Sequence, residues 1–216
     1  MTLPNSRSVD ITIPVLAAAL FVPLFIFRSL GPIDFWWWMS LNIALLIALG
    51  AIIDGEHVRA VFSGIRTFPI RKIIWGILSA AVLYAVFFAG NRLSRAILPF
   101  AGSGINDVYG FKEGASTLRI ACLIALFIGP GEELFWRGFL QRRWQNRFGK
   151  SFGFVMAAAL YVLVHAGSGN LILILSAAVG GIFWGFLYMR TGSILLVAVS
   201  HTIWDLAVFL ILPFHS

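Results

Sequence analysis

Three ionisable side chains, Glu132, Glu133 and Arg137, lie inside a run of otherwise apolar residues. Glu133 and Arg137 are four residues apart, so on a helix they share one face and can neutralise each other as an ion pair. Glu132 lies about 100° away round the same helix and has no partner close in sequence. Pro130 and Gly131 come directly before it and loosen the helix, which frees backbone groups and admits water. An unpaired carboxylate beside such a break is suited to hold a water molecule and remove a proton from it.

Two histidines and an aspartate in later apolar runs add to this set. His201 and Asp205 are again four residues apart, so they face the same way and can present hydrogen-bonding groups to a reacting carbonyl, or one can orient the other. His165 comes from another run and could hold the same water or carry a proton. With a rise of about 1.5 Å per helical residue, Glu132, His165 and His201 can lie at one depth. We expect them to meet near the middle of a bilayer.

Each of these groups also has a purely structural explanation. A single histidine in an apolar run is more often a satisfied core residue, and Glu133 with Arg137 is most simply a structural ion pair. Ionisable groups inside a bilayer are expensive, however, and are usually functional. Because the whole set together would make a very costly core, the sequence indicates a functional site.

The elements that carry these residues have the composition of a membrane protein. The chain is 60% hydrophobic and 12% charged, about half the charged fraction of a soluble domain. Several apolar runs approach or exceed the length of roughly 18 residues that marks a spanning helix. We therefore predict an all-α fold, a polytopic membrane bundle of about seven transmembrane helices, or eight if the connection 91–119 adds one. The expected spans are residues 13–27, 35–53, 73–90, 116–143, 152–166, 171–189 and 194–214.

The net charge of +7 comes from basic residues in the connections between apolar runs. That placement indicates contact with lipid head groups, and we expect no nucleic-acid partner. An odd number of spans places the two termini on opposite sides of the membrane. With the N-terminus in the cytoplasm, the inner connections hold more Lys and Arg than the outer ones, as the positive-inside rule requires. The inner set is Arg7, Arg59, Arg66, Arg71, Lys72, Arg142, Arg143, Arg147, Lys150 and Arg190, and the outer set is Arg28, Arg92, Arg95, Lys112 and Arg119.

Three short motifs follow one another on successive expected helices. They are Glu132-Glu133-x-x-x-Arg137, Tyr161-x-x-x-His165 and His201-x-x-x-Asp205. In order, spacing and placement this set resembles the CPBP intramembrane proteases, the family of the Rce1-like CAAX prenyl endopeptidases and of the bacterial Abi proteins. The resemblance covers residues 116–214 as a catalytic core. The helices within residues 1–115 match no specific motif, and we expect 1–216 to form a single membrane domain.

The resemblance implies an intramembrane endopeptidase, a peptide hydrolase acting on a membrane-associated protein or peptide. Glu132 would activate the attacking water with help from His165. His201 and Asp205 would stabilise the oxyanion, and Glu133 with Arg137 would support the site. We expect an integral protein of a prokaryotic inner or plasma membrane.

Two positions depart from the family pattern. Tyr161 stands where the family has Phe, which adds a hydroxyl group. Asp205 stands where the prenyl-protease branch has Asn. A carboxylate donates a hydrogen bond only when protonated, so the alternative role of Asp205 is to orient His201.

Other functions remain open at this point. Glu132, His165 and His201 could supply three zinc ligands with an open fourth position. The sequence has no His-Glu-x-x-His motif and no cysteine near the set, so nothing demands zinc, and we expect a glutamic-type mechanism without a cofactor. A non-catalytic immunity or scaffold protein is the second alternative. The absence of an inverted repeat argues against a transporter. Whether the substrate is prenylated, a sorting signal or a free peptide is not determined by these residues.

Overall fold

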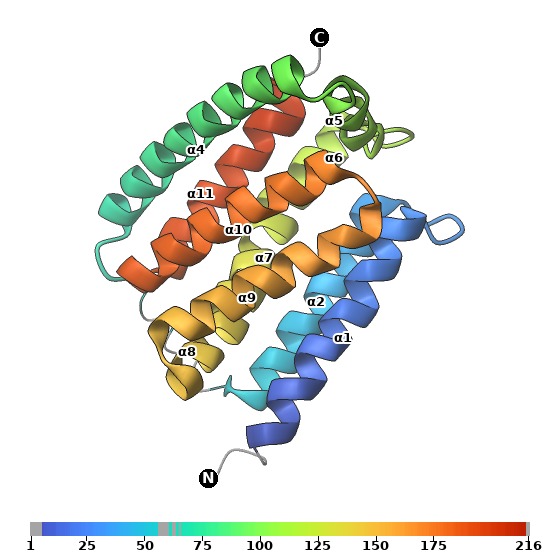
Figure 1. Cartoon of the computed structure of the whole chain (residues 1–216). Coiled ribbons are helices and arrows are strands. Elements are labelled where there is room, and N and C mark those ends of the chain that lie inside the picture. The colour runs from blue at the N-terminus through green and yellow to red at the C-terminus, as the bar shows by residue number, and fades with distance from the viewer. Residues whose placement is uncertain (1–5, 56–60, 62–63, 65, 215–216) are drawn as a thin grey trace.

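The computed structural model of the chain describes residues 6–55, 61, 64 and 66–214 (Figure 1). Every element named in that range is a helix, which confirms the all-α prediction. The long helices are α1 (Ser6–Phe27), α2 (Phe35–Ile53), α4 (Pro69–Ile97), α9 (Lys150–His165), α10 (Leu171–Thr191) and α11 (Ile194–Leu206), the last extended by the π-helix η4 (Ala207–Ile211). Shorter elements are α5 (Ala101–Gly110) and the 3-10 turn η3 (Ala166–Ser168).

The motif-bearing span is a continuous helical run that alternates between α and π geometry. Its parts are α6 (Thr117–Leu123), η1 (Ile124–Ile128), α7 (Gly129–Glu133), η2 (Leu134–Gln141) and α8 (Arg142–Phe148). Pro130 lies inside this run, at the junction where the π segment η1 passes into α7, and it cannot donate a backbone hydrogen bond there. The expected break before Glu132 is therefore a change of helical geometry, and π segments occur frequently at functional sites.

Six helices in the described part of the chain are long and apolar enough to cross a membrane. They carry large exposed apolar side chains on their outer faces, as lipid contact requires. The run from α6 to α8 corresponds to the fourth expected span, residues 116–143. None of its α or π parts reaches 18 residues, and it holds the buried charges, so it does not count among the six. A polytopic helical bundle is confirmed.

Ion pairs at one end of the bundle join α8 to the first two helices. Arg143 and Arg147 pair with Asp10 of α1, and Arg142 pairs with Asp54 at the end of α2. The described chain begins at this end and finishes at the opposite one (Figure 1), in agreement with an odd number of crossings.

The opposite end has its own polar contacts. Asp34 caps α2 and pairs with Arg119 of α6, while Arg28 forms two hydrogen bonds of 2.8 Å to Asp107 of α5. The hydrogen bonds from Arg28 hold the pKa of the Asp107 carboxyl below its usual value. Polar layers at both ends of an apolar bundle are what a membrane-spanning protein requires.

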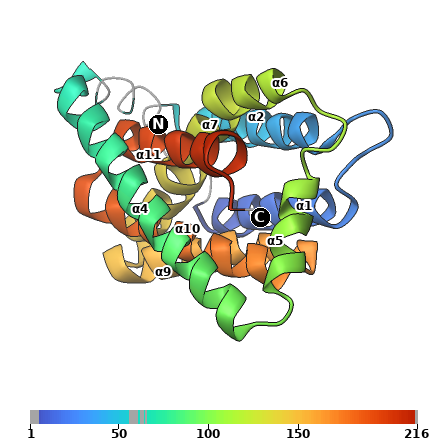
Figure 2. The same ribbon diagram turned by 90° about the horizontal axis from the view of Figure 1, so that it is seen from above.

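The connection between residues 91 and 119 contains a short helix of its own. Helix α4 runs on to Ile97, and α5 is a separate helix of ten residues that packs against α10 and α4 (Figure 2). Because α5 is far too short to span a bilayer, it does not add an eighth crossing. It closes one end of the bundle instead.

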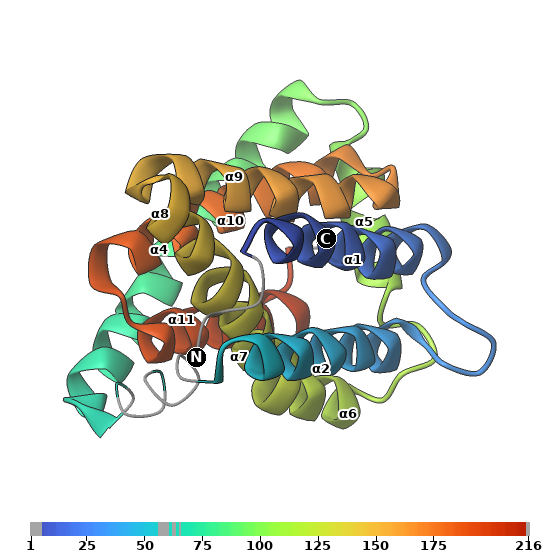
Figure 3. The ribbon, with the colours of Figure 1, turned by 90° about the horizontal axis from the view of Figure 1, so that it is seen from below.

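Helix α7 lies between α11 and α2 (Figure 3). Two glycines permit this close approach. A Cβ atom at Gly129 would lie 2.3 Å from Oγ1 of Thr202 on α11, and one at Gly131 would lie 2.4 Å from Cγ2 of Ile43 on α2. Small residues at such contacts are the usual means by which membrane helices pack tightly. They bring the carboxylates of α7 within reach of α11.

Candidate active site

A cavity of about 440 Å³ opens between α2, α4, α7, α9, α10 and α11. Most of its lining is apolar. The motif residues with ionisable side chains that line it are Glu132, Tyr161, His165, His201 and Asp205, and Tyr109 of α5 lines it as well. All of the ionisable residues predicted from the sequence are buried, and the cavity brings five groups from three helices, α7, α9 and α11, to one place. This is the polar site expected near the middle of the bundle.

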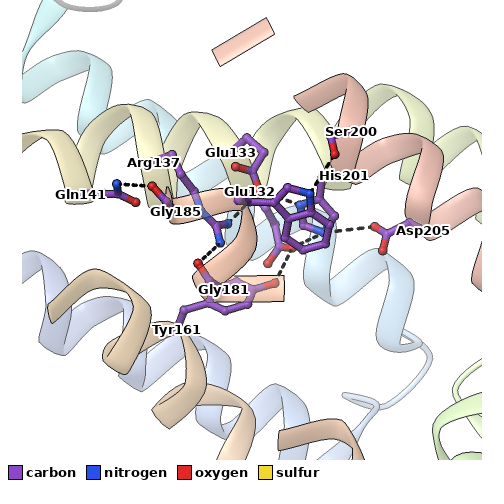
Figure 4. A network of polar contacts seen from close by, with 11 residues as sticks. Glu132, Glu133, Arg137, Gln141, Tyr161, Gly181, Gly185, Ser200, His201 and Asp205 are labelled. Carbon is purple, nitrogen blue, oxygen red and sulfur yellow. Dashed lines mark hydrogen bonds and ion pairs between the residues drawn. The ribbon is translucent and has the colours of Figure 1, made fainter. Parts of the chain in front are cut away.

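Glu133 is the central acceptor of the site (Figure 4). Its Oε1 atom accepts a hydrogen bond of 2.8 Å from Nη1 of Arg137, the i,i+4 pair expected from the sequence. The same oxygen lies 2.7 Å from Nδ1 of His201. Because this oxygen already accepts a hydrogen bond from Arg137, Nδ1 of His201 is taken as the donor in the second contact. Glu133 therefore orients His201 as well as neutralising Arg137.

The imidazole of His201 is also held from its face. The ring of Trp184 on α10 stacks on it, with centroids 3.7 Å apart and an angle of 22° between the planes. Trp184 itself donates a hydrogen bond of 3.2 Å from Nε1 to Oγ of Ser200. Neither Trp184 nor Ser200 could be identified as a site residue in the sequence, because both lie in ordinary apolar runs. With its face and one nitrogen occupied, His201 has a single orientation, and Nε2 is directed at the acids beside the cavity.

Glu132 makes two long contacts, and both involve the same oxygen. Its Oε2 atom lies 3.5 Å from Nε2 of His201 and 3.4 Å from the hydroxyl of Tyr161. Within the described residues, no hydrogen bond or ion pair is formed by Oε1. Glu132 thus lines the cavity with one oxygen directed to its neighbours and the other available to a water molecule or a substrate.

Asp205 faces the same ring nitrogen from the other side. Its Oδ2 atom lies 3.5 Å from Nε2 of His201, one helical turn away on α11. The i,i+4 relationship expected from the sequence is therefore present. The carboxylates of Glu132 and Asp205 therefore both lie 3.5 Å from the same nitrogen of His201.

His165 lies at the end of α9 and lines the same cavity. Its Nδ1 atom donates a hydrogen bond of 2.7 Å to the backbone carbonyl of Tyr161, and its ring packs against Phe25 with centroids 4.4 Å apart. No hydrogen bond or ion pair between described residues joins His165 to Glu132 or His201. With Nδ1 protonated, Nε2 of His165 is a hydrogen-bond acceptor. It can accept from a water molecule but does not touch the carboxylate directly.

The three residues considered as zinc ligands do not form a metal site in this arrangement. Among the residues that the structure describes, no three His, Cys, Asp or Glu side chains are grouped so that they could hold a metal ion. Nδ1 of His201 is bonded to Glu133 and Nδ1 of His165 to a carbonyl group. In each histidine Nδ1 is engaged, and Nε2 is the ring nitrogen left for a proton or a ligand.

Comparison with known proteins gives one informative finding. Residues 114–207 match the family model described as type II CAAX prenyl endopeptidase Rce1-like. No curated protein and no solved structure matches the chain. The matched segment contains all three motifs, so the family resemblance predicted from them is confirmed. Over these residues the chain is similar to a family of CAAX proteases, which are peptide hydrolases.

Proposed function

We propose that this Rce1-like chain is an intramembrane endopeptidase of the glutamic type. In it, Glu132 activates a water molecule that hydrolyses a peptide bond of a membrane-associated substrate. The observation that carries the proposal is the asymmetry of Glu132, whose Oε2 contacts His201 and Tyr161 while Oε1 has no such contact among the described residues. A buried carboxylate with one free oxygen beside a cavity is a suitable general base.

The proposed reaction begins with a water molecule between Glu132 and His165. One proton of the water passes to Glu132, and Nε2 of His165 accepts a hydrogen bond from the other. The water oxygen attacks the carbonyl carbon of the scissile peptide, and the carbonyl π electrons move onto its oxygen. When this tetrahedral intermediate collapses, the C–N bond breaks and Glu132 returns its proton to the leaving nitrogen. The products are one new carboxyl group and one new amine, with no cofactor consumed.

His201 and Asp205 are proposed to stabilise the negative charge on the carbonyl oxygen. His201 would carry protons on both ring nitrogens, donating from Nδ1 to Glu133 and from Nε2 to the oxyanion. Asp205 would act by orienting His201, or as a donor itself when protonated. Preorganised donors of this kind typically contribute about 10² to 10³ in rate. Glu133 and Arg137 keep the arrangement in place without touching the substrate.

The decisive experiment compares Glu132→Gln with a matched control, Glu113→Gln, in which an exposed carboxylate outside the cavity is changed. The purified variants are reconstituted in liposomes with a quenched farnesylated peptide ending in a CAAX sequence and, separately, with the same peptide carrying a palmitoyl group. We expect Glu132→Gln to abolish cleavage with an unchanged melting temperature, and Glu113→Gln to cleave normally. Cleavage by folded Glu132→Gln at the normal rate would refute the proposal.

Cleavage in ¹⁸O water, followed by mass spectrometry, tests for hydrolysis, which must place one labelled oxygen in the new carboxyl group with or without zinc. Plasma mass spectrometry of chelator-treated, active protein tests the zinc version, because stoichiometric metal that activity requires would replace the metal-free mechanism. If the folded Glu132→Gln variant keeps the full cellular phenotype, the immunity or scaffold function is favoured.

The proposed location is a prokaryotic inner or plasma membrane with the N-terminus in the cytoplasm. The distribution of Lys and Arg between the two ends supports it. The test fuses to the N-terminus a reporter that is active only outside the cytoplasm. Activity of this fusion would contradict the proposed orientation.

A further inference from the structure

The hydroxyl of Tyr161 points at the carboxylate that the proposed function makes the general base (Figure 4). It lies 3.4 Å from Oε2 of Glu132 and is the donor in that contact. We propose that Tyr161 is a positioning residue for Glu132, which holds Oε2 by a hydrogen bond and so keeps Oε1 free for the water. This inference rests on the proposed function and gives a role to the hydroxyl group that this chain has where the family motif has Phe.

The ring of Tyr161 is fixed on several sides. Trp136 meets it edge-on, with centroids 5.3 Å apart and planes at 87°, and the guanidinium of Arg137 lies 4.8 Å above it. On the α10 side, a Cβ atom at Gly181 would lie only 3.0 Å from Cδ1 of Tyr161. The ring therefore occupies space that a larger residue at position 181 would take. A hydroxyl on such a ring has little freedom to move.

A buried tyrosine hydroxyl needs a polar partner, because an unpaired one is costly in an apolar interior. Tyr161 is buried, and Glu132 is the acceptor that the described residues provide. At 3.4 Å the hydrogen bond is long. Catalytic hydrogen bonds are often long before substrate binds and shorten in the reacting complex.

The geometry favours positioning over direct chemistry. Tyr161 and His201 approach the same oxygen of Glu132 from two different helices, α9 and α11. The hydrogen bond from Tyr161 and the adjacent His201 ring both constrain Oε2, and Oε1 is the atom that remains. A phenylalanine at position 161 would keep the packing of the ring but remove one of these two constraints.

The test uses Tyr161→Phe and, as a matched control, Tyr188→Phe, which removes the hydroxyl of another buried tyrosine outside the cavity lining. In the liposome assay we expect Tyr161→Phe to lower kcat on the order of tenfold with KM unchanged, the usual effect of one hydrogen bond to a charged group. Tyr188→Phe should leave both constants unchanged. Infrared spectroscopy adds an independent readout. The carboxyl band that disappears in Glu132→Gln should shift in Tyr161→Phe and stay in place in Tyr188→Phe.

An unchanged kcat in folded Tyr161→Phe overturns the inference, whether or not the infrared band shifts. If Glu132→Gln is inactive while Tyr161→Phe is fully active, the inference about Tyr161 fails and the proposed function stands. If Glu132→Gln cleaves normally, the proposed function fails as well. Should Tyr161→Phe unfold, 3,5-difluorotyrosine at position 161 keeps the ring but makes its hydroxyl more acidic. The donor is then lost at lower pH, so the dependence of kcat on pH should change, and an unchanged pH dependence would overturn the inference.

Discussion

Nδ1 of His201 on α11 lies 2.7 Å from Oε1 of Glu133 on α7, a hydrogen bond between residues that are 68 positions apart. The same oxygen accepts from Arg137, so one buried carboxylate serves two cationic or donor groups. Glu133 is therefore more than the partner of Arg137. It connects the supporting ion pair to the ring that faces Glu132 and Asp205, and three predictions depend on this connection or its surroundings.

Removing Arg137 should destabilise the protein strongly. In Arg137→Met, the buried Glu133 carboxylate keeps only His201 as a partner, and losing one member of a buried ion pair typically costs about 3–5 kcal/mol. Arg190→Met is the control, because Arg190 is exposed and its guanidinium lies over the Phe186 ring. Unfolding in mixed micelles with increasing SDS measures the difference. Equal stability of the two variants would contradict a structural role for the Glu133–Arg137 pair.

Asparagine should replace Asp205 better than alanine does. Asp205→Asn keeps the shape, and its amide can donate a hydrogen bond toward an oxyanion, so we expect kcat within about tenfold of the unchanged protein. Asp205→Ala removes the group entirely and should lower kcat by about 10² or more. Initial rates with the quenched lipopeptide provide the comparison. A folded Asp205→Asn as inactive as Asp205→Ala would mean that the carboxylate itself is required.

A methyl group at Gly129 should push α7 away from α11. In Gly129→Ala the new Cβ would lie 2.3 Å from Oγ1 and 3.0 Å from Cα of Thr202, so the helices must separate. Overpacking of this kind typically costs about 1–3 kcal/mol. Since the Glu133–His201 hydrogen bond crosses this contact, activity should fall together with stability. Gly102→Ala is the control, because its Cβ would meet only Nη1 of Arg95, at an ordinary 3.7 Å. Normal activity and stability of Gly129→Ala would contradict the close packing.

The Arg28–Asp107 pair makes stability depend on acid pH. The pKa of Asp107 is lowered from 3.8 by its hydrogen bonds to Arg28, so the pair stabilises the fold above that value and ceases to do so as pH falls through the lowered pKa. Because both side chains are partly exposed, solvent screening limits the contribution to about 1 kcal/mol or less. Asp107→Asn should therefore be slightly less stable at neutral pH and should match the unchanged protein below the lowered pKa. A stability difference that persists there would show that the charge is not its cause.

Much of the molecule follows from local features of the sequence. Apolar runs of sufficient length predict the spanning helices, since a bilayer requires every backbone group to be bonded within its own segment. The pairs Glu133–Arg137 and His201–Asp205 could be predicted because a spacing of four residues sets side chains on one helix face. The three motifs likewise identified the segment that the family model matches.

The contacts between helices could not be predicted in this way. The hydrogen bond from His201 to Glu133, the stacking of Trp184 on His201 and the approach of Tyr161 to Glu132 each join different helices. Such contacts depend on the distance and rotation between helices, which glycines such as Gly129 and Gly181 adjust through tertiary packing. The sequence by itself therefore determined which ionisable groups enter the membrane and which of them share a helix face. Only the tertiary structure decided that Glu133 holds His201 and that Glu132 keeps one oxygen free. These contacts join different helices, and the spacing of residues along the chain does not set how two helices rotate and pack against each other.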